Sequence, residues 1–131
     1  MKLIVQEWLE KAKEDLQTIN EIKNNDYLTN IMSFHAQQAI GKCFKAIIEA
    51  YKIEFVKEHN LLTLYNKIKN YIDFQVGNQM LNEISKIYLT ARYPGELGLL
   101  PEGKPSISDA LSYYQVAGDI YNKTVKLLKN S

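Results

Sequence analysis

The segment from about residue 27 to about residue 52 constrains the fold most. At the angular step of an α-helix, about 100° per residue, its apolar side chains fall into two adjacent stripes. The first stripe holds Ala36, Ile40, Cys43, Ile47 and Ala50, and the second holds Phe34, Phe44, Ile48 and Tyr51. Only a narrow polar arc remains, made of His35, Gln38, Lys42, Lys45 and Glu49. Because a helix that is apolar over most of its circumference lies at the centre of a bundle, we predict that the other helices pack around this one.

Four further segments have helical periodicity, at about 3–24, 60–72, 79–92 and 107–128. The residues expected to face inward are, in turn, Val5, Trp8, Ala12, Leu16 and Ile19; Leu61, Leu64, Ile68 and Tyr71; Leu81, Ile84, Tyr88 and Ala91; and Leu111, Tyr114, Gly118, Tyr121, Val125 and Leu128.

Helix-breaking and helix-capping residues lie between these segments, as expected for separate helices. All three prolines lie between residues 94 and 105, which predicts a loop there, either a mobile lid or a simple crossing of the bundle. Asn78 is expected to cap the fourth helix, and Ser106 with Asp109 is similar to a capping box before the last one. We therefore predict an all-α fold in one domain, residues 1–131: an up-and-down bundle of four long helices and a short one.

The composition of the chain indicates in which cellular environment the protein is expected to fold. A chain of 131 residues that is 46% hydrophobic can bury a core, and its net charge of +1 gives no overall attraction to nucleic acid or membranes. No run approaches the roughly 18 apolar residues of a membrane span. The first ten residues lack the apolar core of a secretion signal. The lone Cys43 cannot form an internal disulfide, so we expect a cytoplasmic protein without membrane association.

Metal and cofactor binding have no support in the sequence. The only histidines, His35 and His59, lie far apart and belong to no cluster with ligand spacing. Gly95 and Gly98 follow a helix, whereas a phosphate-binding glycine loop follows a strand and opens a helix. Cys43 falls on an apolar stripe and is interpreted as a small buried side chain. We expect no metal and no cofactor.

Three segments together resemble the HEPN family. The first is Trp8-Leu9-x-x-Ala12-x-x-Asp15-Leu16. The second runs from Phe34 to Ala46 (FHAQQAIGKCFKA) and is followed by His59-x-Leu61. The third is Tyr88-x-x-Ala91-Arg92-Tyr93-Pro94-Gly95.

The resemblance implies a four-to-five-helix bundle that forms homodimers. It also implies a small nucleotidyltransferase as partner, in a two-component arrangement like that of toxin–antitoxin systems. Some relatives are metal-independent endoribonucleases that use an arginine and a histidine four to six residues downstream. Other relatives have lost that pair and act as binding modules.

The sequence departs from the catalytic pattern after Arg92, where residues 93–99 contain no histidine. Gly41 is a second departure, because many relatives carry glutamate there. Tyr93 is a poor replacement for a histidine base, since the pKa of an unperturbed tyrosine is about 10. Enzymatic activity is therefore left open.

The leading interpretation is an interaction module that binds nucleotide or RNA phosphate near Arg92. Its ligand-binding candidates are Arg92, Tyr93, Lys42, His35 and Lys104. The alternative is an endoribonuclease toxin in which Arg92 works with a displaced histidine, His35 or His59. Each candidate also has a structural interpretation: Arg92 as a C-terminal helix residue, Tyr93 as part of a helix stop, His59 as a capping or packing residue, and His35 and Lys42 as parts of a solvated face.

Overall fold

A computed structural model of the chain describes residues 1–54, 57–92 and 104–129, and for residues 87–92 it describes the backbone alone. The elements in chain order are α1 (Leu3–Ile22), the 3₁₀ helix η1 (Asp26–Leu28), α2 (Thr29–Ala50), α3 (Leu61–Ile68), α4 (Asn78–Arg92) and α5 (Ile107–Lys129). The predicted all-helical fold is confirmed. Within the described part of the chain, no helix combines the length and apolar character that a membrane span requires.

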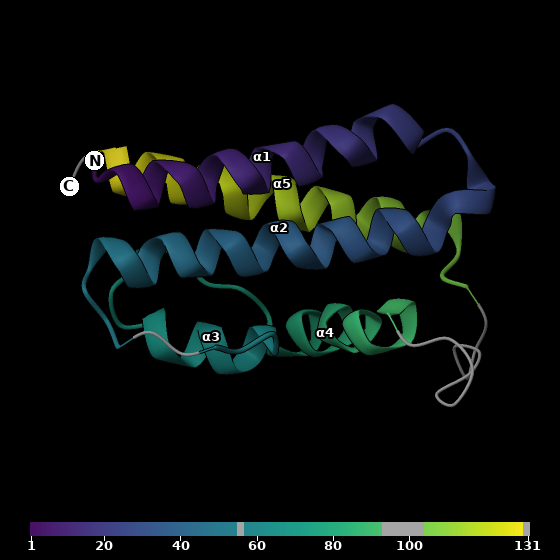
Figure 1. Cartoon of the computed structure of the whole chain (residues 1–131). Coiled ribbons are helices and arrows are strands. Elements are labelled where there is room, and N and C mark those ends of the chain that lie inside the picture. Colours follow the sequence, from purple (N-terminus) through teal and green to yellow (C-terminus); the bar gives the residue numbers. More distant parts are fainter. Residues whose placement is uncertain (55–56, 93–103, 130–131) are drawn as a thin grey trace.

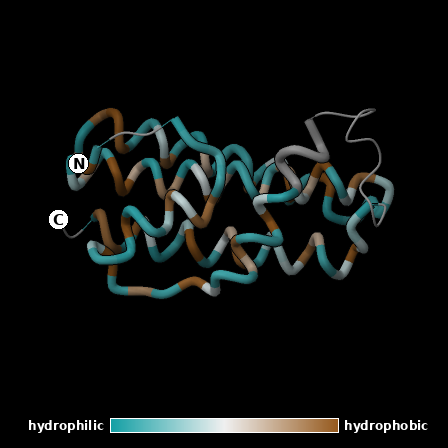
Figure 2. Tube along the Cα trace, turned by 90° about the horizontal axis from the view of Figure 1, so that it is seen from below, coloured by the Kyte–Doolittle hydropathy of each residue, from teal (hydrophilic) through white to brown (hydrophobic). Residues whose placement is uncertain are grey.

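The helix α2 lies at the centre, as its two apolar stripes predict. It contacts α1, α3, α4 and α5. Figure 1 shows α1 on one side of α2 and α3 and α4 following one another on the other side, with α5 completing the bundle. Apolar and polar segments alternate along the helices, so each helix turns one face inward (Figure 2).

Small side chains let the neighbours of α2 come close. Ala36, Ala39 and Ala46 are fully buried, and a Cβ added at Gly41 would sit 3.6 Å from the Leu61 side chain, an ordinary van der Waals contact. The larger core side chains between them include Phe44, Ile40 and Ile47.

Two predicted helix ends are wrong. The third helix ends at Ile68, short of residue 72, so Tyr71 is half exposed. Asn78 is the first residue of α4, not a cap before it. At α5, by contrast, the Asp109 N–H donates to Ser106 Oγ at 3.0 Å, which confirms the predicted cap.

The predicted inward face of α5 is correct at Leu128, which is buried, and wrong over the rest of the helix. Leu111 is 39% exposed, and Tyr114, Gly118, Tyr121 and Val125 are only partly buried. The other buried residues of α5 lie beside this stripe: Ala110, Tyr113, Ala117, Ile120 and Thr124. The main partner of α5 is α2, and small residues on both helices favour a close approach of their backbones. Large apolar residues therefore lie at the edge of this contact.

Candidate functional site

A buried carboxylate links α1 to the polar arc of α2. The Asp15 side chain is only 8% exposed, and its two oxygens have different partners. Asp15 Oδ1 lies 2.8 Å from His35 Nδ1, and Asp15 Oδ2 accepts a hydrogen bond from Lys42 Nζ at 2.7 Å. His35 and Lys42 are about two helical turns apart, which places them on the same face of α2.

This geometry fixes the orientation of the histidine. An ionised carboxylate only accepts hydrogen bonds, so the Nδ1 facing Asp15 carries the proton. Nε2 of the neutral ring is then the acceptor, and the His35 side chain is 26% exposed. A carboxylate behind the other ring nitrogen is the arrangement found in general bases.

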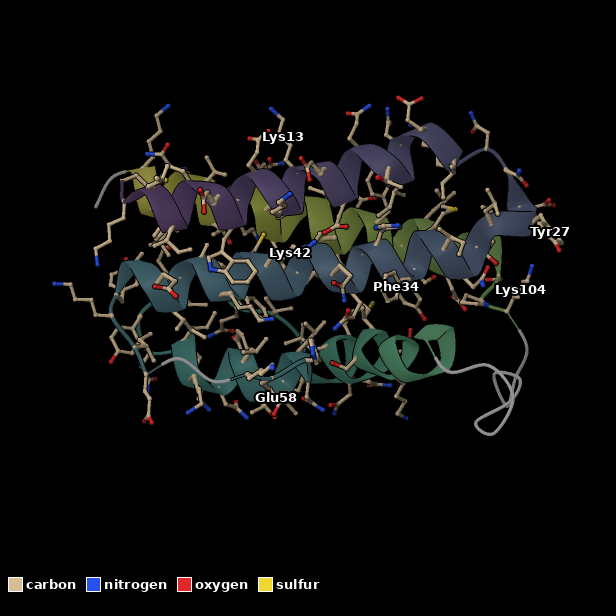
Figure 3. The ribbon with its side chains drawn as sticks, viewed as in Figure 1. Lys13, Tyr27, Phe34, Lys42, Glu58 and Lys104 are labelled. Atoms are coloured by element: carbon tan, nitrogen blue, oxygen red, sulfur yellow. The ribbon has the colours of Figure 1, made fainter. Side chains whose placement is uncertain are left out.

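A cavity of about 180 Å³ continues along the same arc of α2. Its wall includes Trp8 of α1, Lys42 and Lys45 of α2, and Glu58 and His59 of the segment before α3. Figure 3 labels Lys42 on α2 and Glu58 beside α3, both near the middle of the length of the bundle.

Two glutamines of α2 form hydrogen bonds that attach the His59 segment of the cavity wall to this helix. Gln37 Nε2 donates to the His59 carbonyl at 3.0 Å, and Gln38 Nε2 donates to Gln37 Oε1 at 2.7 Å. Glu58 Oε1 accepts from the N–H groups of His59 and Asn60 at 3.0 and 2.9 Å. The segment that carries His59 is therefore attached to α2 through directional bonds.

Lys42 and Lys45 both lie in the cavity wall, but they differ in their partners. Lys42 donates to Asp15, whereas Lys45 has no hydrogen bond to a carboxylate among the described residues. Lys45 Nζ lies 5.4 Å from the centre of the Trp8 ring, a cation–π distance. Burial lowers the pKa of Lys45, and the nearby charge of Lys42 lowers it further, whereas Glu58 acts in the opposite direction.

The remaining candidates lie elsewhere or outside the described residues. The α4 helix ends at Arg92, whose side chain is outside the described part, and Tyr93 and the expected loop of residues 93–103 are outside it altogether. Lys104 Nζ donates to the Tyr27 carbonyl at 2.8 Å and sits 3.7 Å above the Tyr27 ring. Figure 3 places this pair at one end of the bundle, away from Lys42.

The structure thus brings His35 and Lys42 together and keeps Lys104 apart from them. It also adds Asp15, Trp8 and Lys45 as site residues. The sequence contained a signal for Asp15, because a charged residue on the stripe shared by Ala12 and Ile19 needs partners when it is buried.

Cys43 and metal ligation are separate from this site. Cys43 is buried, and burial raises the pKa of its thiol to about 12, which agrees with its interpretation as a small buried side chain. Among the described residues, no group of three or more histidine, cysteine or acidic side chains is placed to hold a metal ion.

Comparison with known proteins now identifies the family. The family model described as HEPN domain matches residues 5–128, nearly the whole chain. The chain belongs to the HEPN family. The HEPN bundle is also similar to the crystal structure of an archaeal HEPN homologue, with a TM-score of 0.69 and 24% sequence identity over 98% of this chain and 99% of that one. This structural likeness shows the shared fold. No curated protein sequence matches the chain significantly.

Proposed function

We propose that this HEPN protein is a binding module that forms a homodimer, partners a small nucleotidyltransferase and holds the phosphate of a nucleotide or RNA. The observation that supports binding over catalysis is the placement of His35. Its Nδ1 lies against Asp15 of α1, and α1 and α4 lie on different sides of α2 (Figure 1). Within one subunit, the His35 ring is therefore bound to α1, whereas Arg92 is the last residue of α4, on the other side of α2. This arrangement does not favour a catalytic pair of the two residues in the same subunit.

The assembly is tested by mass. Light scattering at micromolar concentration is expected to give twice the mass of the 15.1 kDa chain. Co-expression with a small nucleotidyltransferase from the same organism is expected to yield one co-purifying complex. A monomer that also fails to co-purify would contradict the proposal.

A second candidate function is RNA cleavage, favoured by one observation. The Asp15–His35 pair leaves His35 Nε2 as the acceptor nitrogen, as a general base requires. An arginine from a second subunit would then have to supply the cation that stabilises the phosphorane.

Single-turnover cleavage of RNA separates the two functions. We expect wild type, Arg92→Ala and His35→Ala to show the same background rate. A wild-type rate that falls at least about 100-fold in both variants would instead establish the nuclease, because removing a general base or a charge-stabilising group costs about this much.

A further inference from the structure

The α5 helix carries an apolar stripe that the subunit leaves partly open. Leu111, Tyr114, Gly118, Tyr121 and Val125 follow one another at alternating steps of three and four residues, the spacing of a coiled-coil contact. Leu111 is exposed, and the other four are only partly buried. The stripe therefore has the pattern of a helix–helix contact, but no second helix covers it within the described part of the chain.

A groove between α1 and α5 runs along this stripe. Figure 1 shows the two helices side by side, with the start of α1 and the end of α5 at the same end of the bundle. The groove has a volume of about 560 Å³, and Leu16 of α1 lines it together with residues of the stripe. Its charged lining residues are one cation and one anion, Lys23 and Asp119. Because these charges balance, the groove favours an uncharged protein surface over a nucleic acid.

The middle of the stripe is a glycine that packing within the subunit does not require. Gly118 lies in the interior of α5, where glycine costs about 1 kcal/mol relative to alanine. A Cβ added there would meet no heavy atom within 4 Å among the described residues. A position without a side chain lets another backbone approach closely from outside. Gly118 therefore marks the place where a second helix fits best.

The stripe is symmetric about this glycine. Tyr114 lies four residues before Gly118 and Tyr121 three residues after it, while Leu111 and Val125 lie seven residues before and after. If two copies of α5 pack antiparallel about a two-fold axis at Gly118, tyrosine meets tyrosine and leucine meets valine. A two-fold contact requires such a self-complementary surface, because the same patch supplies both sides. The symmetry therefore favours a second copy of this chain over an unrelated protein.

The solvent side of the stripe fits the same arrangement. Ser108, Gln115 and Asn122 recur there every seven residues, and all three are exposed and uncharged. In an antiparallel pair centred on Gly118, Gln115 of one copy lies level with the Asn122 position of the other, where side-chain amides both donate and accept hydrogen bonds. Protein interfaces are enriched in tyrosine and depleted of charge at their centre, as this face is.

We propose that two copies of this chain pair through the α5 face centred on Gly118, antiparallel and about a two-fold axis, with Leu16 of α1 at the edge of the contact. The inference rests on the homodimer of the proposed function and adds its surface and its symmetry. Because α4 lies on the other side of α2 from α1 (Figure 1), the α4 side stays accessible for a different partner.

Gly118→Glu tests the surface. The dimer dissociation constant, measured by sedimentation equilibrium, is expected to rise at least about 100-fold, because two glutamates meet at the axis and hold the backbones apart. The subunit itself is expected to stay folded by circular dichroism, since the Cβ position is open and glutamate favours helix more than glycine does. Asn82→Glu, at an exposed position of α4, changes the charge equally and is expected to leave the constant within about twofold.

Gly118→Cys tests the symmetry. A residue on a two-fold axis faces its own copy, so diamide, which takes up the two thiol hydrogens, is expected to link two chains through one disulfide. Non-reducing electrophoresis detects the linked dimer. Wild type is expected to give none, because its single thiol, Cys43, is buried. Asn82→Cys is the exposed control and is also expected to run as a single chain.

The outcomes separate this inference from the proposed function. A monomeric wild type overturns the homodimer and the inference together. A wild-type dimer that Gly118→Glu leaves intact and that Gly118→Cys does not cross-link overturns the inference alone, because the dimer then uses another surface. If Gly118→Glu stays dimeric but no longer co-purifies with the nucleotidyltransferase, the face belongs to that partner and the inference is likewise overturned.

Discussion

Asp15 has its carboxylate inside the bundle and its two hydrogen-bonding partners on another helix. His35 and Lys42 are each about one quarter exposed, so water weakens the charge interactions without removing them. The carboxylate therefore stabilises the fold chiefly by satisfying two donors that α2 would otherwise leave half-buried and unpaired.

Replacing this carboxylate tests its contribution. We expect Asp15→Asn to lower the free energy of unfolding by about 1–3 kcal/mol, because Lys42 then lacks a counter-charge. Urea denaturation measures the change. Glu14→Gln is the matched control, since Glu14 is an exposed carboxylate paired with Lys11 at 3.6 Å, and its loss is expected to stay within about 0.5 kcal/mol. Equal stability of the two variants would contradict the role of Asp15.

Cys43 gives a pH dependence with a defined sign. Its folded-state pKa, about 12, lies above the ordinary value of 9.0 for a cysteine thiol, so the unfolded chain loses the thiol proton first. Stability from the neutral thiol is fully present below about pH 9 and is lost as the pH rises toward 12.

The Cys43→Ala variant isolates that effect. We expect urea unfolding of wild type to lose more stability between about pH 8 and about pH 10 than unfolding of Cys43→Ala. Burial also raises the pKa of Tyr121, and the charge of an ionised Cys43 raises it further, so the difference between the two profiles contains the Cys43 thiol and its interaction with Tyr121. Parallel pH profiles would contradict the assignment.

At the scale of elements, the end of α2 contains a strained residue. Lys52 has a φ of 55°, in the left-handed region, directly after the C-cap Tyr51. The Ile53 N–H donates to the Ile48 carbonyl and the Lys52 N–H to the Glu49 carbonyl, the paired bonds of a Schellman motif. Glycine is the residue best suited to this position.

We expect Lys52→Gly to raise the free energy of unfolding by about 0.5–1 kcal/mol, because glycine adopts positive φ without a Cβ penalty. Thermal denaturation followed by circular dichroism measures the gain. Lys23→Gly at the C-cap of α1, where φ is −63°, is the control and is expected to lower stability instead. A loss in both variants would show that Lys52 is not strained.

The register of α5 is testable in the same way. Ala117 is fully buried, so Ala117→Leu is expected to cost about 1–3 kcal/mol by overpacking. Leu111 lies on the partly exposed face, so Leu111→Ser is expected to cost less than about 1 kcal/mol. Urea denaturation of both variants decides between the faces, since the reverse order would place the Leu111 stripe in the core.

At the scale of the whole molecule, one helix organises the bundle. Because α2 contacts each of the other four α-helices, damage to its core face should destabilise them together. If residues 1–131 form a single domain, as predicted, all the helices are expected to unfold together in one cooperative transition.

Ile47→Ala tests that cooperativity. Ile47 is fully buried on α2, and the truncation is expected to cost about 2–5 kcal/mol. Trp8 emission, which reports on α1, and far-UV circular dichroism, which reports on all helices, are expected to give one coincident urea transition in both proteins. Two separate midpoints would show independently unfolding parts.

The sequence by itself determined the helices, the central place of α2 and the cap at Ser106. These features depend on local periodicity and on side chains a few residues apart. The resemblance to HEPN proteins rested on short motifs spread along the chain, which the family match over residues 5–128 supports.

Only the tertiary structure decided which side chains meet. The Asp15 carboxylate joins His35 and Lys42 because α1 lies against the polar arc of α2. The face of α5 with Ala117 is buried because close helix packing favours small side chains over the larger ones that define an apolar stripe. Trp8 of α1 and Lys45 of α2 line one cavity because the two helices pack against each other. The distance between packed helices depends on how the side chains of both surfaces fit together, and the sequence of one helix alone does not contain that information.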